Sequence, residues 1–166
     1  MNLVDITTKQ IETVHIANRH MEELESSLYI VDVAGGEPQK VSTDEICFWH
    51  GWSPDGNTLA YTGYKKGNLD VYTIPVIGGK AKRLTKTEGL DDGPEYSTDG
   101  KYISYIEDQK QQHLFGKKVK LRLMNLETKE ITDLTSVFYG GQGTINVPSW
   151  SPDSKRVAFV SYSIGN

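Results

Sequence analysis

The chain has 166 residues, of which 37% are hydrophobic and 24% are charged, and its formal net charge is −4 at pH 7. This composition is typical of a soluble globular domain with a core of its own, and it excludes the strongly basic surface that a nucleic-acid backbone requires. No run of 18 apolar residues occurs, so we expect no membrane-spanning helix.

The first residues, Met1–Asp5 (MNLVD), lack the apolar segment of a signal peptide. We therefore expect a cytoplasmic protein, or a periplasmic one if a leader peptide is missing. The single cysteine, Cys47, cannot form an internal disulfide, and its apolar neighbours predict a buried thiol.

Two short hairpins are predicted in the first 43 residues. Residues 1–16 and residues 17–43 each contain two segments rich in β-branched and apolar residues, and in the second hairpin Gly35 and Gly36 provide the turn. Neither hairpin has the additional strand pair that occurs later in the chain. We interpret residues 1–16 as an orphan hairpin and residues 17–43 as an incomplete repeat.

A complete repeat is predicted for residues 44–86. At its centre lies Gly51–Gly56 (GWSPDG), in which proline presets φ and glycine adopts a backbone angle that other residues avoid, so a tight turn joins two strands. A second hairpin follows, with its turn at Gly78 and Gly79. Residues 44–86 therefore predict four antiparallel strands.

The same pattern returns in residues 89–136, where the altered copy Glu95–Gly100 (EYSTDG) places Ser97 44 residues after Ser53. In this repeat, Lys117–Lys120 alternates basic and apolar residues and predicts the solvated face of a strand. A third copy, Ser149–Ser154 (SWSPDS), precedes one more predicted strand, Arg156–Val160.

Repeats of this length are typical of β-propellers, in which each blade is a four-stranded antiparallel sheet. The sequence predicts one all-β domain, residues 1–166, that forms a propeller or partial propeller of about four blades, one of them incomplete. Residues 1–16 are expected to pair with residues 147–163, so that the two ends of the chain complete one blade.

The motif Trp52–Gly56, with the strands and the Gly78-Gly79 turn that follow it, resembles the TolB-type β-propeller repeat. Three segments also look like a bacterial TolB-related subfamily of uncharacterised function: Trp49–Trp52, Asp91–Tyr96 and Gly140–Asn146. The resemblance covers roughly residues 28–163. It implies a propeller fold, but it is weakly specific for function because one fold hosts many activities.

Proteins of this family are typically six-bladed, whereas this chain has material for about four blades. Two architectures stay open at this point. The chain forms a small closed ring by itself, or it is part of a larger ring, which a second copy of the chain could complete as a homodimer.

The loops before the first strand of each repeat are expected to lie at one mouth of the propeller channel, where ligands commonly bind. They supply His50, Asp91, Asp92, Gln142, Thr144 and Asn146. One interpretation is a ligand site, and the other is that these side chains cap backbone groups of the loops. The Asp91-Asp92 pair is a weak candidate for a divalent cation, since carboxylates suit hard metal ions; no other cofactor is expected.

The repeats also carry an aromatic residue at one equivalent position, which is Trp52, Tyr96 or Trp150. We expect these three side chains to be structural and to be buried between neighbouring blades.

No Gly-x-Ser-x-Gly elbow and no His-Glu-x-x-His spacing occurs, so no catalytic residue is assigned. The preferred function is a non-catalytic scaffold that binds a protein or a small ligand. One alternative is a carbohydrate-active or metal-dependent hydrolase or lyase with its site at the channel mouth. Another is a detached propeller domain of a prolyl oligopeptidase-type peptidase.

Overall fold

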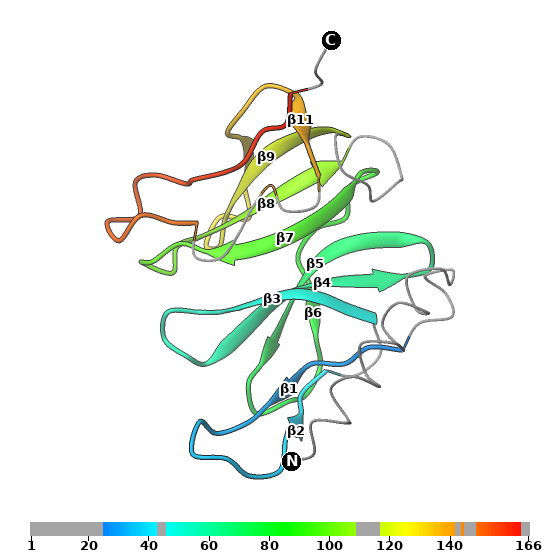
Figure 1. Ribbon diagram of the computed structural model, residues 1–166, viewed down its shortest axis with the longest axis vertical. Helices are drawn as coiled ribbons and strands as arrows, with labels where there is room; N and C mark the ends of the chain where they lie inside the picture. The colour runs from blue at the N-terminus through cyan, green and yellow to red at the C-terminus, as the bar shows by residue number, and fades with distance from the viewer. Residues whose placement is uncertain (1–24, 43–45, 109–116, 142–143, 145–148, 164–166) are drawn as a thin grey trace.

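A short hairpin and two larger antiparallel sheets follow one another along the molecule in the order of the chain (Figure 1). The computed structural model describes residues 25–42, 46–108, 117–141, 144 and 149–163. Every regular element in these residues is a β-strand, which confirms the predicted all-β class. The hairpin pairs β1 (Tyr29–Ile30) with β2 (Gln39–Lys40).

The first sheet is the four-stranded blade predicted around the Gly51–Gly56 turn, and its strands occur in the order β3-β4-β5-β6. Their bounds are β3 Ile46–Trp52, β4 Thr58–Lys65, β5 Asn68–Pro75 and β6 Lys82–Arg83. The outermost strand, β6, has only 2 residues.

The second sheet repeats this order as β7-β8-β9-β10 and adds one strand, β11, that also pairs with β9. Its strands are β7 Leu90–Tyr96, β8 Tyr102–Asp108, β9 Lys117–Asn125, β10 Ile131–Asp133 and β11 Phe138–Gly140. The basic segment Lys117–Lys120 lies in β9, as the alternation predicted. Its Val119 is buried, while Lys120 pairs with Asp133 at 2.6 Å.

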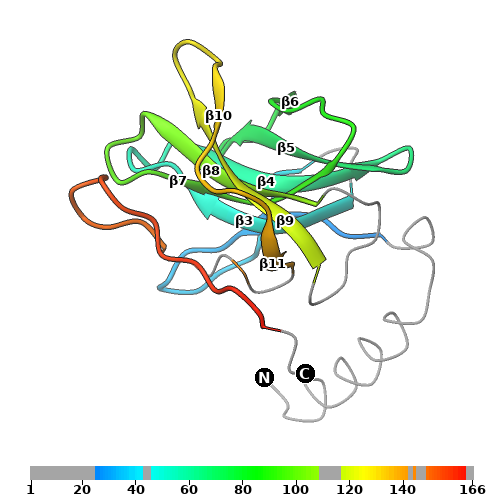
Figure 2. The same cartoon turned by 90° about the horizontal axis from the view of Figure 1, so that it is seen from above.

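The two sheets are stacked rather than placed side by side, because they overlap when seen along the long axis (Figure 2). Successive side chains of β4 point to opposite faces of the first blade. Leu59 packs toward the β1–β2 hairpin in a cluster that also contains Cys47, whereas Ala60 packs against Ile103 of the second blade. The predicted burial of the Cys47 thiol is therefore confirmed.

The three copies of the repeated turn fold alike and point to the same side of the molecule (Figure 1, left). In the first copy, the Ser53 hydroxyl donates to Asp55 Oδ1 at 2.5 Å and accepts from the Thr58 N–H at 2.9 Å. The matching distances are 2.7 and 3.0 Å at Ser97, and 2.6 and 2.9 Å at Ser151. The repeated serine thus stabilises the turn itself.

In the third repeat, no regular strand covers residues 156–160 within the part of the chain that the structure describes, which leaves out residues 145–148. Within the described residues, only Trp150 and Val157 form an isolated bridge. Three backbone N–H groups each donate to a carbonyl in a different segment: Ala158 to Ser149, Val160 to Thr144 and Tyr162 to Tyr139. A continuous ladder would require successive bonds to one neighbouring strand.

The closure between residues 1–16 and 147–163 lies partly outside the described residues and stays a prediction, as does completion of the ring by a second copy. Within the described part of the chain, no helix is long and apolar enough to cross a lipid bilayer.

Candidate functional site

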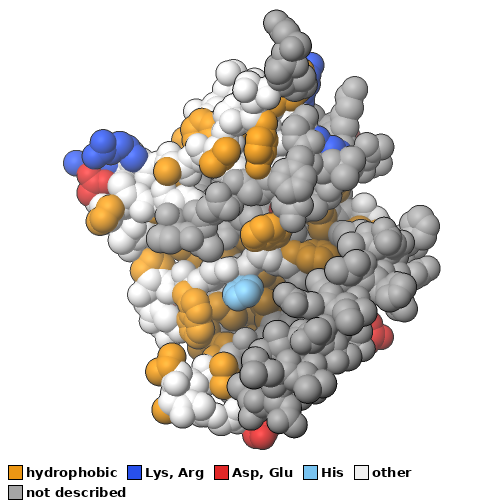
Figure 3. All heavy atoms as spheres, viewed as in Figure 1, with side chains coloured by type: hydrophobic (Ala, Val, Ile, Leu, Met, Phe, Trp, Pro, Cys, Tyr) orange, Lys and Arg blue, Asp and Glu red, His pale blue; other side chains and the backbone are white. Residues whose placement is uncertain are grey.

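An open groove of about 460 Å³ lies beside the ends of β3 and β7. Its lining comes from three successive repeats and consists of His50, Gly51, Trp52, Glu95, Tyr96, Thr98 and Trp150. Figure 3 shows hydrophobic side chains gathered around a histidine on this face. The groove is therefore aromatic on its sides and has a few polar groups.

The repeated aromatic position supplies three of the groove's side chains, and their burial differs. Trp52 is 50% exposed and lines the open groove, so it is not buried between blades as expected. Tyr96 is partly buried against the cluster between the two blades, and Trp150 is also partly buried. The repeat therefore fixes the place of the aromatic side chain but not its environment.

A β-bulge lies at the same repeat position in β3 and in β7. The pairing of β3 shifts between Phe48 and His50, where Trp49 has a φ of 37°. The pairing of β7 shifts after Asp92, where Gly93 has a φ of 64°. A bulge bends a strand and changes the direction of its side chains. His50, which was expected in a loop, lies in β3 beside this bulge and is exposed.

Glu95 is the functional candidate that the sequence analysis missed. Its Oε1 accepts a hydrogen bond of 2.6 Å from the Ser149 N–H, whereas its buried Oε2 has no hydrogen-bond partner. Burial raises the pKa of the Glu95 carboxyl. Comparison of the repeats could have indicated Glu95. The equivalent positions hold Gly51 and Ser149, so the fold does not require an acid there.

Trp150 is fixed by its indole nitrogen at one side of the groove. Its Nε1–H donates to Ser104 Oγ at 3.0 Å and to the Glu95 carbonyl oxygen at 3.3 Å. Beyond Trp150 lies a second, smaller cavity of about 290 Å³, which Leu121 and Val157 help to line. The Trp150 ring thus separates two hollows, and its orientation helps to set the shape of both.

Asp91 and Asp92 lie in β7 rather than in the loop that the sequence suggested, and they make different contacts. Asp92 Oδ1 accepts hydrogen bonds from Thr62 Oγ1 at 2.8 Å and from the Gly93 N–H at 2.7 Å. Asp91 Oδ2 accepts one from Thr87 Oγ1 at 2.8 Å, while its buried Oδ1 has no partner. Burial is the main cause that raises the pKa of Asp91 to about 7.

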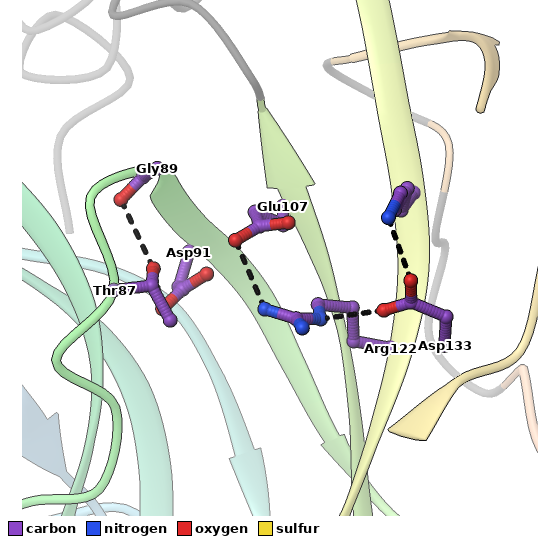
Figure 4. A network of polar contacts seen from close by, with 7 residues as sticks. Thr87, Gly89, Asp91, Glu107, Arg122 and Asp133 are labelled. Carbon is purple, nitrogen blue, oxygen red and sulfur yellow. Dashed lines mark hydrogen bonds and ion pairs between the residues drawn. The ribbon is translucent and has the colours of Figure 1, made fainter. Parts of the chain in front are cut away.

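A chain of charged side chains lies near Asp91 on the second blade (Figure 4). Arg122 donates to Glu107 and to Asp133, in each case at 2.9 Å. A hydrogen bond from Lys120 lowers the pKa of Asp133. The charge of Glu107 makes a smaller contribution to the raised pKa of Asp91. This chain ties β8, β9 and β10 together.

Among the residues that the structure describes, no group of three His, Cys, Asp or Glu side chains is arranged to hold a metal ion. The predicted cation site at Asp91 and Asp92 stays a prediction. Thr144 is fully buried, and Gln142 and Asn146 lie outside the described residues. Of the predicted channel-mouth residues that the structure describes, only His50 is exposed at the groove.

The chain matches the family model of the TolB beta propeller domain over residues 11–113. It is 28% identical to an uncharacterized protein of Agrobacterium fabrum, in an alignment that covers 82% of this chain and 62% of that protein. The Tol-Pal system protein TolB of Francisella tularensis is 31% identical over 56% of this chain and 20% of its own length. The chain thus spans less than two thirds of each relative.

Solved structures give the same fold. A TolB-type protein of Agrobacterium tumefaciens is similar with a TM-score of 0.52 at 26% identity, over 87% of this chain and 69% of the other. An oligogalacturonate lyase in complex with manganese gives a TM-score of 0.61 at 22% identity, over 86% of this chain and 39% of the other. At that identity the likeness shows the fold alone. Since the family model matches more than half of the residues, the chain belongs to the TolB beta propeller domain family.

Proposed function

We propose that this chain is a non-catalytic scaffold that binds a polypeptide in the groove beside β3 and β7. The observation that carries the proposal is an open groove that aromatic side chains from three successive repeats line, with one of them, Trp52, half exposed. Tyr96 and Trp150, from the next two repeats, are partly buried and complete the aromatic lining. Large exposed aromatic side chains are enriched where proteins bind one another.

Aromatic rings suit this role because they bury a large area and lose little conformational freedom when a ligand binds. A polar side chain at the edge, Thr98, and the imidazole of His50 can exchange hydrogen bonds with a peptide backbone. An apolar centre with a polar rim is the usual arrangement of a binding surface.

The far side of the groove is held in place before any ligand arrives. Ser149 is tied to Glu95, and the turn after Tyr96 is tied to the next turn by two bonds. In these, Thr98 Oγ1 donates to the Ser151 carbonyl at 3.0 Å, and the Asp99 N–H donates to Ser154 Oγ at 2.8 Å. A preorganised surface loses less entropy on binding, which favours affinity.

Peptide selection on the full chain tests the proposal. A random peptide library displayed on phage is selected against the wild-type chain, and each enriched peptide is then measured against Trp52→Ala. We expect the enriched peptides to bind Trp52→Ala at least about tenfold more weakly than the wild-type chain, equivalent to about 1.4 kcal/mol. Val33→Ala is the matched control, because Val33 is fully exposed on the β1–β2 hairpin. Enriched peptides that bind Trp52→Ala as well as the wild-type chain would contradict the proposal.

A further inference from the structure

We propose that the groove recognises the positive head of an arginine or lysine side chain on the bound polypeptide, held by the Glu95 carboxylate and the neighbouring aromatic rings. This inference rests on the proposed function and adds the chemical class of the ligand. It is carried by Glu95, which lines the groove, is 7% exposed and has one oxygen without a hydrogen-bond partner.

The unpartnered oxygen is unusual because buried carboxylate oxygens are normally hydrogen-bonded or paired with a positive charge. The Ser149 N–H donates to Oε1 of Glu95, and the Ser149 hydroxyl and the Trp150 backbone also stabilise the charged carboxyl group, but Oε2 has no partner within hydrogen-bond distance. A guanidinium or ammonium group supplies N–H donors and a positive charge, so it satisfies both requirements of this oxygen.

The other walls of the groove fit the same ligand. Trp52, Tyr96 and Trp150 are aromatic, and the face of an aromatic ring attracts a cation. The guanidinium group also stacks on aromatic faces, and the aliphatic stem of a basic side chain packs against apolar surface. A carboxylate beside several aromatic rings is therefore suited to a long side chain with a positive end.

The surrounding charge favours a cation as well. The phenol of Tyr96 lies close enough to Asp55 for that carboxylate to contribute, after burial, to the rise of the Tyr96 pKa to about 12. A hydrogen bond from Ser53 lowers the pKa of Asp55, so this carboxylate is charged at neutral pH. The chain as a whole has a net charge of −4.

The comparison between repeats indicates that the repeat fold does not require an acid at the position of Glu95. The equivalent residue is Gly51 in the first repeat, where an added Cβ atom would meet only the Pro94 carbonyl oxygen, at 3.8 Å. In the third repeat it is Ser149. Of these three equivalent residues, only Glu95 is an acid, and it lines the same groove as Trp52, Tyr96 and Trp150.

Nuclear magnetic resonance of the ¹⁵N-labelled full chain tests the proposal through the indole N–H signals of its three tryptophans. The probes are acetyl-Gly-Gly-Arg-Gly-Gly-amide and the same peptide with citrulline, which has nearly the shape of arginine but no charge. We expect the arginine peptide to shift the Trp52 and Trp150 signals with a dissociation constant of roughly 1–10 mM, and the citrulline peptide to bind at least about tenfold more weakly.

Glu95→Gln removes the charge but keeps an acceptor for the Ser149 N–H. It should weaken the arginine peptide about tenfold and abolish the preference over citrulline. Glu127→Gln is the matched control, since Glu127 is exposed after β9 and the net charge changes equally. Equal affinities of the two peptides for the wild-type chain, or an unchanged affinity in Glu95→Gln, would overturn the inference.

A second variant covers the case in which Glu95→Gln does not fold. Trp52→Ala, at a half-exposed side chain, should also weaken the arginine peptide, and an unchanged affinity would again overturn the inference. The two proposals fail differently. If selected peptides need Trp52 but show no preference for arginine over citrulline, only the cation preference fails; if no peptide contacts the groove, the binding function fails too.

Discussion

The Thr62 hydroxyl donates a hydrogen bond of 2.8 Å to Asp92 Oδ1 and so joins β4 of one blade to β7 of the next. Thr62 is fully buried and Asp92 is 4% exposed, so water does not replace this bond easily. Buried polar bonds between blades add specificity to a seam that apolar contacts would otherwise hold in several similar ways.

Replacing the donor should weaken this seam. Thr62→Val keeps the shape of the side chain but leaves Asp92 with one fewer donor, so we expect a loss of about 1–3 kcal/mol in the free energy of unfolding. Urea denaturation measures it. Thr73→Val in β5 is the control, because Thr73 is only partly buried, and it should change stability by less than about 0.5 kcal/mol. Equal effects at both sites would contradict the role of the bond.

Stability should depend on pH through Asp91. In the folded state this carboxyl has a pKa of about 7, against 3.8 for an ordinary aspartate. The folded chain therefore keeps the proton up to about pH 7, whereas the unfolded chain releases it near pH 4, and stability falls as the pH rises through this interval. Between pH 5 and pH 8, Asp91→Asn should gain about 2–3 kcal/mol relative to the wild-type chain.

Chemical denaturation of both chains at pH 5, 6, 7 and 8 checks the Asp91 prediction. Glu88→Gln, at an exposed side chain, is the control and should run parallel to the wild-type chain. A constant difference between Asp91→Asn and the wild-type chain across this range would show that the carboxyl does not titrate there.

The equivalent tryptophans should differ in their importance for folding. Trp150→Ala removes a partly buried ring and the indole bonds to Ser104 and Glu95, so we expect a loss of about 2–4 kcal/mol. Trp52→Ala should cost less than about 1.5 kcal/mol because half of this ring is already exposed. Thermal unfolding compares the two alanine variants. The loss of stability in Trp150→Phe should be smaller than in Trp150→Ala and larger than in Trp52→Ala. A larger loss at Trp52 than at Trp150 would refute this order.

The repeated turns should share a requirement for glycine. Gly56 and Gly100 have φ values of 72° and 73°, and an added Cβ atom at Gly56 would meet no neighbour, so Gly56→Ala should cost about 1 kcal/mol through backbone strain alone. In the third turn Ser154 has a φ of 57°. Ser154→Gly and Ser154→Ala both lose the hydroxyl, and the glycine variant should be more stable by about 1 kcal/mol.

A control for the turn prediction comes from Ser161, which is exposed and is not among the residues with a positive φ. There the alanine variant should be at least as stable as the glycine variant, because glycine only adds conformational freedom to the unfolded chain. Urea denaturation of all four serine variants tests whether the alanine and glycine variants have opposite orders of stability at Ser154 and Ser161. The same order at both positions would exclude backbone strain at Ser154.

The sequence was sufficient for the repeats, the turns and the strands of the two complete blades. Each turn depends on local chemistry, such as the bond from Ser53 to Asp55, and local chemistry can be read from neighbouring residues. The third repeat was harder to predict. Residues 156–160 have the composition of a strand, but a strand also requires a continuous partner, and the described residues provide only separate bonds.

The candidate site was predicted less well, because side-chain burial depends on what faces the strand. Position within the repeat suggested that Asp91 and His50 would share an open mouth, yet Asp91 is fully buried and His50 is exposed. Glu95 was missed because only the structure shows that one carboxyl oxygen bonds to the Ser149 N–H while the other has no hydrogen-bond donor. Comparison of equivalent positions could have indicated it.

The outer edges of both sheets have a consequence for behaviour at high concentration. In the first sheet the outermost strand, β6, has 2 residues, and in the second the long outer side of β9 is divided between β10 and β11, with 3 residues each. A free edge recruits foreign strands through a row of consecutive unpaired backbone groups. Edges this short offer an incoming strand only a few bonds in register, which protects the outer edges of the two blades from edge-to-edge aggregation.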